Sequence, residues 1–285
     1  MKKYISIALV FVVVLLIMAL IIRGSNDSEE VYDGFVQQVE QNDTPSSSNP
    51  VGQLRTGLEI PCYDFVVDEQ IMAKRGYTVS FNPDTKLPNW VAYELTADET
   101  DGPWTRKGLR FVPDPYCKGE QADREDYRNS GYSHGHLAPA GDMKWDSLAM
   151  IESFYYTNCI PQDANLNTGK WHQLEEKTRK LAREYGNVYI VTGPVIQYDS
   201  IERIGNHGIP VPIACYKALM IRNKERYSAI GFVMLNGGEQ RSMKECACTV
   251  DELEALLGLN MFYNLPNDIE EGVESKVTWA DWNLR

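Results

Sequence analysis

The segment Ser133-His134-Gly135-His136-Leu137-Ala138-Pro139-Ala140 holds two of the four histidines in the chain. Side chains alternate along a strand, so His134 and His136 are expected on one face of a short strand. Gly135 between them allows a sharp backbone feature. Taken alone, such a pair is typical either of a metal site or of a polar strand end that faces solvent. Candidate chemistry is concentrated between residues 131 and 175.

The next segment is rich in asparagine and leads into a helix. It contains Asn158-Cys159-Ile160-Pro161-Gln162 and Leu166-Asn167-Thr168-Gly169-Lys170-Trp171. Side chains suited to a buried helix face then recur at steps of three and four before a glycine stop: Trp171, Leu174, Thr178, Leu181, Tyr185 and Gly186. Asn167 either caps this helix or serves the site. Glu175 follows Asn167 by eight residues, about 80° of helical rotation, so both can lean towards one site.

Strand signals flank these motifs on both sides. Five segments are rich in β-branched and aromatic residues and are bounded by Gly, Pro or Asn: 76–82, 89–95, 188–192, 214–220 and 229–235. Thr249 and Glu252 predict a capping box that opens a second helix. No regular helices separate the strands, which argues against a doubly wound parallel sheet. We therefore predict an α+β fold with a mixed or antiparallel sheet core and flanking helices.

The first residues predict a membrane segment. An apolar run of 18 residues, Ile5 to Ile22, follows two lysines and is interrupted only by Ser6. It is long enough to span a bilayer and ends without a small-x-small cleavage site. We predict that residues 1–23 form a signal anchor or transmembrane helix, with the rest of the chain outside the cytoplasm. A secreted or periplasmic protein is the alternative if the segment is cleaved. Residues 24–57 are predicted to be a flexible acidic, Ser- and Pro-containing tether, and residues 58–285 the folded domain.

Charge and cysteine content indicate which partners and which kinds of cysteine site the chain can have. The chain has 40 acidic and 28 basic residues, a net charge of −12, which is not typical of a polyanion binder. Residues 101–180, however, carry 12 acidic and 11 basic side chains. A local basic rim is therefore allowed, built from Arg106, Lys107, Arg110, Arg128, Lys144 and Lys170. The six cysteines form either disulfides or buried thiols; a zinc site at Cys246-Ala247-Cys248 is the less favoured alternative.

Taken together, the motifs between residues 133 and 175 resemble the DNA/RNA non-specific endonuclease family, whose active site is a ββα-metal motif. Further matches lie at 88–93 and 191–194, and the resemblance covers roughly Leu58 to Trp279. It implies a phosphodiester hydrolase that cuts DNA and RNA without sequence specificity and leaves 5′-phosphate ends. It also implies a requirement for Mg²⁺, with Mn²⁺ as an alternative. The domain at 58–285 would then be the endonuclease domain.

The resemblance also implies roles for four residues. His136 takes the position of the general base that activates water, a role suited to a side chain with a pKa near 6.5. Asn167 takes the position of the only direct protein ligand of the metal, since Mg²⁺ prefers oxygen ligands and retains water. Glu175 would orient metal-bound water. Asn158 would position either the His136 region or the substrate.

The sequence departs from the family in one place and is ambiguous in another. The family's Asp-Arg before Gly-His is replaced by Ser133 and His134, so positive charge beside the scissile phosphate depends on protonation of His134. We therefore expect activity to fall as the pH rises. Arg106 and Arg110 both compete for a second family arginine, and Arg110 is favoured because it adjoins Phe111.

Two alternatives remain beside the endonuclease. One is a catalytically weakened relative that binds nucleic acid at the cell surface. The other is a phosphodiesterase that acts on a smaller substrate. The retained His136, Asn167 and Glu175 favour an active endonuclease over the weakened relative, whereas substrate competition is needed to exclude the second alternative.

Overall fold

The computed structural model describes residues 57–197, 202–224, 226–237 and 241–284. The predicted membrane helix at residues 1–23 and nearly all of the predicted tether lie outside these residues. None of the helices in the described ranges is sufficiently long and apolar to cross a membrane.

The strands are β1 (Cys62–Tyr63), β2 (Gln70–Ala73), β3 (Thr78–Asn82), β4 (Leu87–Thr96), β5 (Ser133–His136), β6 (Cys159–Gln162), β7 (Asn187–Val195), β8 (Arg203–Ile204), β9 (Ile209–Pro210), β10 (Ala214–Asn223), β11 (Arg226–Leu235), β12 (Ala247–Cys248) and β13 (Leu259–Asn260). The helices are α3 (Arg124–Tyr127), α4 (Ser147–Glu152), α5 (Ala164–Leu166), α6 (His172–Tyr185), α7 (Val250–Leu257) and α8 (Asn267–Glu274).

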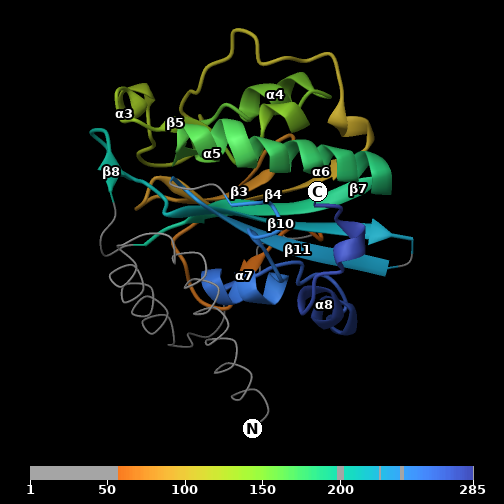
Figure 1. Cartoon of the computed structure of the whole chain (residues 1–285). Helices are drawn as coiled ribbons and strands as arrows, with labels where there is room; N and C mark the ends of the chain where they lie inside the picture. The colour runs from red at the N-terminus through yellow and green to blue at the C-terminus, as the bar shows by residue number, and fades with distance from the viewer. Residues whose placement is uncertain (1–56, 198–201, 225, 238–240, 285) are drawn as a thin grey trace.

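A seven-stranded sheet forms the centre of the molecule (Figure 1). Its strand order is β12-β11-β10-β7-β4-β3-β2, and every neighbouring pair is antiparallel. The five predicted strands are β3, β4, β7, β10 and β11, which confirms the α+β fold and narrows the sheet to an antiparallel one.

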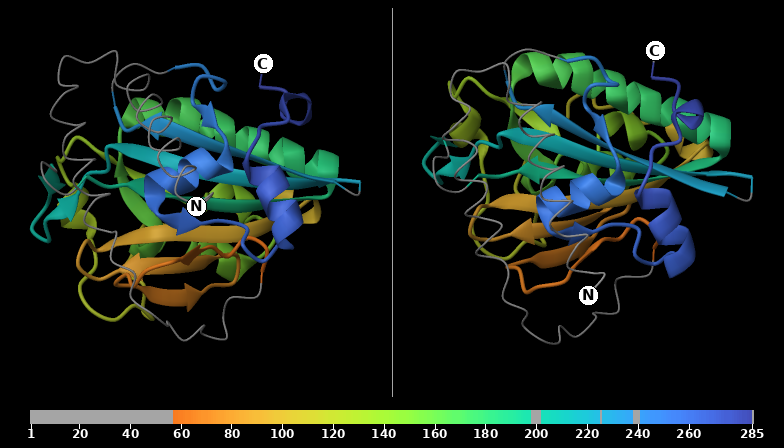
Figure 2. Two further views of the ribbon diagram at one scale, coloured as in Figure 1. Left: turned by 90° about the horizontal axis from the view of Figure 1, so that it is seen from below. Right: turned by 60° about the horizontal axis from the view of Figure 1, so that its bottom comes forward.

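Both faces of this sheet are covered by helices. Helix α6 lies over one face, and α7 and α8 lie over the other (Figures 1 and 2). Side chains of β10 alternate between two core clusters: Cys215 and Leu219 pack on the α6 side, whereas Tyr216 and Met220 pack on the side of α7 and α8. Burial on both faces explains why the central strands are apolar at nearly every position.

The two helices predicted from sequence are present with their expected ends. Helix α6 buries Leu174, Thr178 and Leu181, and it ends at Gly186, whose φ of 94° suits a residue without a side chain. Helix α7 begins at Thr249, and its capping box with Glu252 is formed in both directions.

A second, smaller ladder positions the candidate site. Strands β5 and β6 pair only with each other, and β6 leads through α5 and a π-helical turn at Asn167–Trp171 into α6. The result is a strand-strand-helix unit on the α6 face of the central sheet.

Candidate active site

Strand β5, which pairs with β6, carries the two histidines. His134 lies opposite Pro161 and His136 lies opposite Cys159. A side chain at Gly135 would place its Cβ 2.6 Å from the Cβ of Gln162, so no larger residue fits without displacement of β6. The glycine is therefore required by close approach of the two strands rather than by a sharp turn.

Aromatic rings enclose both histidines, which lie on the same side of β5 as predicted. The ring of Phe111 stacks on His134 at 5.1 Å between centroids and contacts His136 at 4.6 Å. Tyr127 covers the other side of His134 at 4.1 Å, and Phe154 meets His136 edge-on at 4.8 Å. These contacts fix both imidazole planes.

The same enclosure keeps both histidines uncharged at neutral pH. Burial, with added repulsion from Arg106 and His134, lowers the pKa of His136 to about 3. Burial also lowers the pKa of His134. The Nε2 atom of His136 is shielded and has no hydrogen-bond partner among the described residues. His136 thus has the protonation state that a general base requires.

Asn158 is a buried clamp under this strand. Its Oδ1 accepts a hydrogen bond from the Ala138 amide at 2.9 Å, and its Nδ2 donates to the carbonyls of Ala138 and Ser153, each at 2.8 Å. Its exposed fraction is 0%. Of the two roles expected for Asn158, these contacts are consistent with support of the His136 segment, because its amide is buried and already engaged.

The segment containing Asn167 differs from a simple helix cap. Asp163 provides the cap, since its carboxylate accepts from the amides of Asn165 and Leu166. Asn167 lies in the π-helical turn that follows, and Thr168 beside it donates to the Ala164 carbonyl. The Asn167 side chain borders the cavity and has no hydrogen-bond partner among the described residues. Capping is therefore the wrong alternative for Asn167, and its amide is free for a ligand.

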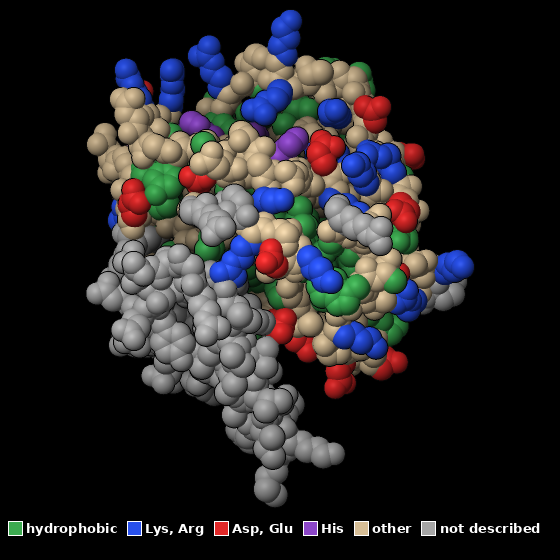
Figure 3. Space-filling view, viewed as in Figure 1, with side chains coloured by type: hydrophobic (Ala, Val, Ile, Leu, Met, Phe, Trp, Pro, Cys, Tyr) green, Lys and Arg blue, Asp and Glu red, His purple; other side chains and the backbone are tan. Residues whose placement is uncertain are grey.

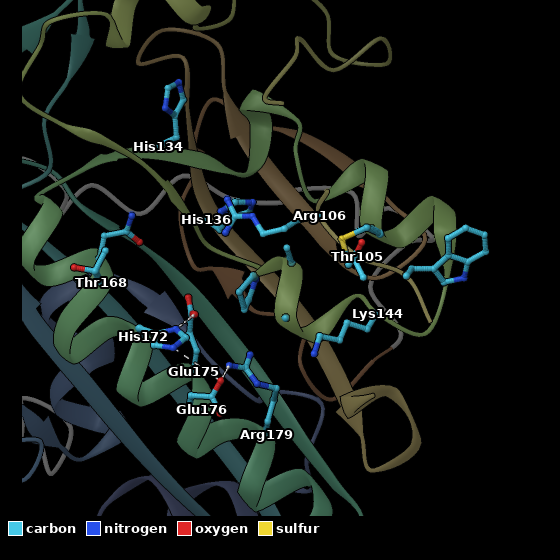
Figure 4. A pocket seen from close by; sticks show the side chains of 16 residues that line it. Thr105, Arg106, His134, His136, Lys144, Thr168, His172, Glu175, Glu176 and Arg179 are labelled. Atoms are coloured by element: carbon cyan, nitrogen blue, oxygen red, sulfur yellow. Dashed lines mark hydrogen bonds and ion pairs between the residues drawn. The ribbon is translucent and has the colours of Figure 1, made fainter. Parts of the chain in front are cut away.

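Glu175 reaches the same cavity from the first turn of α6. Its side chain is 12% exposed, and its carboxylate lies 3.6 Å from Nδ1 of His172. The hydrogen bond to Glu175 raises the pKa of His172. In Figure 4, Glu175 points from α6 towards His136 and Arg106 on the opposite wall.

An ion-pair network that the sequence motifs did not reveal lies under the cavity. Arg179 donates to Asp142 at 2.5 Å and to Glu176 at 2.6 Å. Tyr93 donates to the other Asp142 oxygen at 2.8 Å. Arg179 comes four residues after Glu175 on the same helix face, and this spacing was the available sequence signal.

The cavity has a volume of about 570 Å³. Five of the candidate residues border it and are thus brought together, namely Arg106, His134, His136, Asn167 and Glu175. Basic side chains from three different segments also border it, namely Arg106, Lys144 and Arg179. In Figure 3, basic side chains are spread over the visible face, and several of them lie above the histidines.

Arg106, and not Arg110, borders the cavity. Phe111 faces the histidines, and its neighbour Arg110 is exposed and does not line the cavity. The chain is held in this register by a bridge between Val112 and Tyr155. Of the two arginines, Arg110 was favoured from the sequence, whereas Arg106 lies beside His136 and 5.5 Å from the Phe154 ring; which of them serves the reaction stays a prediction.

The donors at the cavity fit a hard divalent cation. The unpartnered amide of Asn167 and the carboxylate of Glu175 offer oxygens, which Mg²⁺ prefers, and the open cavity leaves room for water in its shell. Two clusters of three acidic or histidine side chains occur in the described residues, but neither is in this cavity. Cys246 and Cys248 are free thiols, and neither of the two clusters contains a cysteine. The described residues therefore give no support to a zinc site at Cys246-Ala247-Cys248.

Comparison with known proteins identifies the family. The model of the DNA/RNA non-specific endonuclease family matches residues 56–268. The chain belongs to this family. It is 35% identical over 207 residues to the mitochondrial nuclease EXOG of Xenopus laevis, covering 67% of this chain and 58% of that protein. It is 30% identical over 219 residues to a nuclease of Serratia marcescens, covering 72% and 79%.

A solved structure supports the fold. A crystal structure of the EndoG/EndoGI complex matches with a TM-score of 0.66 at 23% identity, covering 82% of this chain and 94% of that chain. The chain spans less than two thirds of the EXOG proteins that it matches, for example 58% of the human one.

Proposed function

We propose that this endonuclease-family chain hydrolyses phosphodiester bonds in DNA and RNA, using His136 as base and a divalent cation held at Asn167. The observation that carries the proposal is the convergence of a neutral His136, an unpartnered Asn167 and Glu175 on one cavity with a basic rim. Such a site needs no contact with base edges, which is consistent with cleavage independent of sequence.

His136 accepts the proton of the attacking water. A base must be unprotonated to accept a proton, and the low pKa of His136 keeps it unprotonated across the physiological range. A pKa so far below the working pH also makes the imidazole a weaker proton acceptor than an ordinary histidine. Phe111 and Phe154 hold the ring at a fixed angle. Asn158 holds the following backbone through Ala138, which keeps β5 in register beneath the substrate.

The basic rim binds the phosphate. Arg106 lies beside His136, and Lys144 borders the same cavity, so both can contact non-bridging oxygens of the scissile phosphate. Arg179 is committed to Asp142 and Glu176 and serves mainly to fix the wall of the cavity.

Asn167 would hold the cation directly, and Glu175 would hold it through water. When bound, Mg²⁺ or Mn²⁺ supplies positive charge to the phosphorus centre and the leaving 3′-oxygen. Departure of that oxygen leaves the phosphate on the 5′ end of the product.

His134 is the feature that sets this chain apart within the proposal. Sandwiched between Phe111 and Tyr127 and with a lowered pKa, it contributes little positive charge at neutral pH. Arg106 and Lys144 are then the cations that remain near the phosphate.

The proposal is tested by cleavage of supercoiled plasmid and of single-stranded RNA by the full chain with Mg²⁺, with Mn²⁺ and with EDTA. Nicking of plasmid and degradation of RNA only with metal, and resealing of the nicks by DNA ligase, are expected. Binding without cleavage at every pH from 5.5 to 8.5 would contradict the proposal and favour the weakened, binding relative.

We further propose that the apolar run Ile5–Ile22 anchors the nuclease in a membrane with the catalytic domain outside the cytoplasm, or that the domain is released if the run is cleaved. The lysines at its start and the acidic residues after it support this orientation. Protease added to spheroplasts, in which only the cytoplasmic membrane remains closed, should degrade the anchored domain, and protection from protease would contradict the orientation.

A further inference from the structure

A cluster of carboxylates lies on the sheet face opposite the active-site cavity. Asp251 and Glu254 belong to α7, and Glu274 ends α8. Oxygens of these three side chains all lie within 4.8 Å of one another. Glu270, one turn before Glu274, adds a fourth negative charge that acts on Glu254 and Glu274. Figures 1 and 2 place α7 and α8 beside each other, on the side of the sheet away from α6.

Glu274 is the member that points to a ligand. Its side chain is only 4% exposed, and its Oε1 is buried without a hydrogen-bond partner. No ion pair with Glu274 is formed by any residue in the described ranges. A buried carboxylate without a partner is unfavourable, so Glu274 is held either in its protonated form or as a carboxylate bound to a cation, and none of the described residues supplies that cation.

The neighbours of Glu274 offer further oxygens and no positive charge. The charged groups that act on Glu274 are the carboxylates of Glu254, Glu270 and Asp251; together with burial, they raise its pKa to about 10. Asn260 on β13 also has a buried Oδ1 without a partner, while its amide group donates to Glu270.

The spacing fits a single calcium ion. Ca²⁺ is bound by six to eight oxygens at about 2.3–2.6 Å, so two oxygens on one ion can be at most about 5 Å apart. The separations within 4.8 Å satisfy this limit. The donors are carboxylates and an amide oxygen, the ligand types of calcium sites.

We propose that Asp251, Glu254 and Glu274 bind Ca²⁺, with Glu270 and Asn260 completing the site. Bound calcium would link α7 to α8. Because this face is opposite the cavity that holds His136, the ion stabilises the fold and takes no part in cleavage.

Calorimetric titration with Ca²⁺ tests the site in the full chain, purified in detergent and freed of metal. The chain carries Asn167→Ala, so that the active-site cavity does not contribute. Glu274→Gln removes the central ligand while keeping its volume, and Asp268→Asn, an exposed carboxylate on the same helix, is the matched control. Thermal unfolding with and without Ca²⁺ provides a second readout.

One Ca²⁺ per chain is expected in the parent and in Asp268→Asn, with affinity at least tenfold weaker in Glu274→Gln. At a Ca²⁺ concentration 100 times the dissociation constant, the unfolding midpoint should rise by roughly 5–10 °C. Without calcium, Glu274→Gln should have nearly the stability of the parent at neutral pH, because the raised pKa of Glu274 keeps it protonated there. Absence of binding, or equal binding by Glu274→Gln, would overturn the proposal. Neither the presence nor the absence of calcium binding changes the result expected in the nuclease assays. The calcium site and the proposed nuclease activity are therefore tested independently.

Discussion

Replacement of Asn158 by alanine tests whether this side chain supports the backbone next to His136 or contacts the substrate. The change removes three buried hydrogen bonds, to the Ala138 amide, the Ala138 carbonyl and the Ser153 carbonyl. At about 1 kcal/mol for each bond, with a further penalty for the unpaired Ala138 amide, the free energy of unfolding should fall by about 3–5 kcal/mol. Typical domains have about 5–15 kcal/mol of stability, so this loss is a large fraction of the total, and a circular dichroism spectrum at 20 °C must show that the variant is folded before it is assayed.

Urea unfolding measures this loss, and steady-state cleavage measures its consequence. Because Asn158 supports the backbone next to His136, kcat should fall while KM stays close to that of the wild type. Asn165→Ala is the matched control, since Asn165 is exposed on α5 and its side chain has no described partner. A raised KM with unchanged stability would refute the clamp and return Asn158 to a substrate contact.

Three further predictions concern the cavity. Arg106→Gln should lower kcat/KM by roughly 10²-fold, because it removes a cation beside the scissile phosphate, whereas Arg110→Gln should have little effect; steady-state kinetics on plasmid measures both. His134→Arg should raise cleavage above pH 7, where the wild-type His134 is neutral, as a pH–rate profile would record. His136→Gln should flatten the dependence of stability on pH between about 6.5 and 3, as measured by urea unfolding at pH 5 and pH 7.5.

The sign of the His136 effect follows from its depressed pKa. Between a pKa of about 6.5 in the unfolded chain and about 3 in the folded chain, the unfolded state binds the additional proton, so folding stability falls as the pH falls. An unchanged slope in His136→Gln would show that the ring titrates normally. Equal losses in Arg106→Gln and Arg110→Gln would contradict the placement of these two arginines, and a flat or lowered profile for His134→Arg would contradict the charge argument.

The sheet and the main helix were predictable because their signals are local. Strands such as β10 and β11 are buried on both faces, so their sequences are mostly apolar, and the helical period of α6 ends at a glycine. The division at residue 58 and the membrane helix stay predictions, since the residues before 57 lie outside the described part of the chain.

The arginines show what local sequence could not supply. Whether Arg106 or Arg110 faces the cavity depends on the register of an irregular segment. That register is set by the bridge between Val112 and Tyr155 and by the buried ion pair of Lys74 with Asp114, at 2.6 Å. These partners are distant in sequence, so adjacency to an aromatic residue was misleading.

Two roles near the histidines were hidden for a similar reason. Gly135 is required because Gln162 approaches it from β6, a contact that no property of the 133–140 segment predicts. The network of Arg179 with Asp142 joins residues 37 apart in sequence, and only the position of Arg179 on the Glu175 face gave a hint.

Single-turnover cleavage of plasmid over a range of Mg²⁺ concentrations tests the central claim most directly. The full chain is compared with His136→Ala and Asn167→Ala. Loss of the base should lower the rate at least 10²-fold with an unchanged Mg²⁺ requirement, whereas loss of the metal ligand should raise the Mg²⁺ concentration needed for half-maximal rate. Cleavage by either variant at the wild-type rate and Mg²⁺ requirement would place the chemistry outside this cavity.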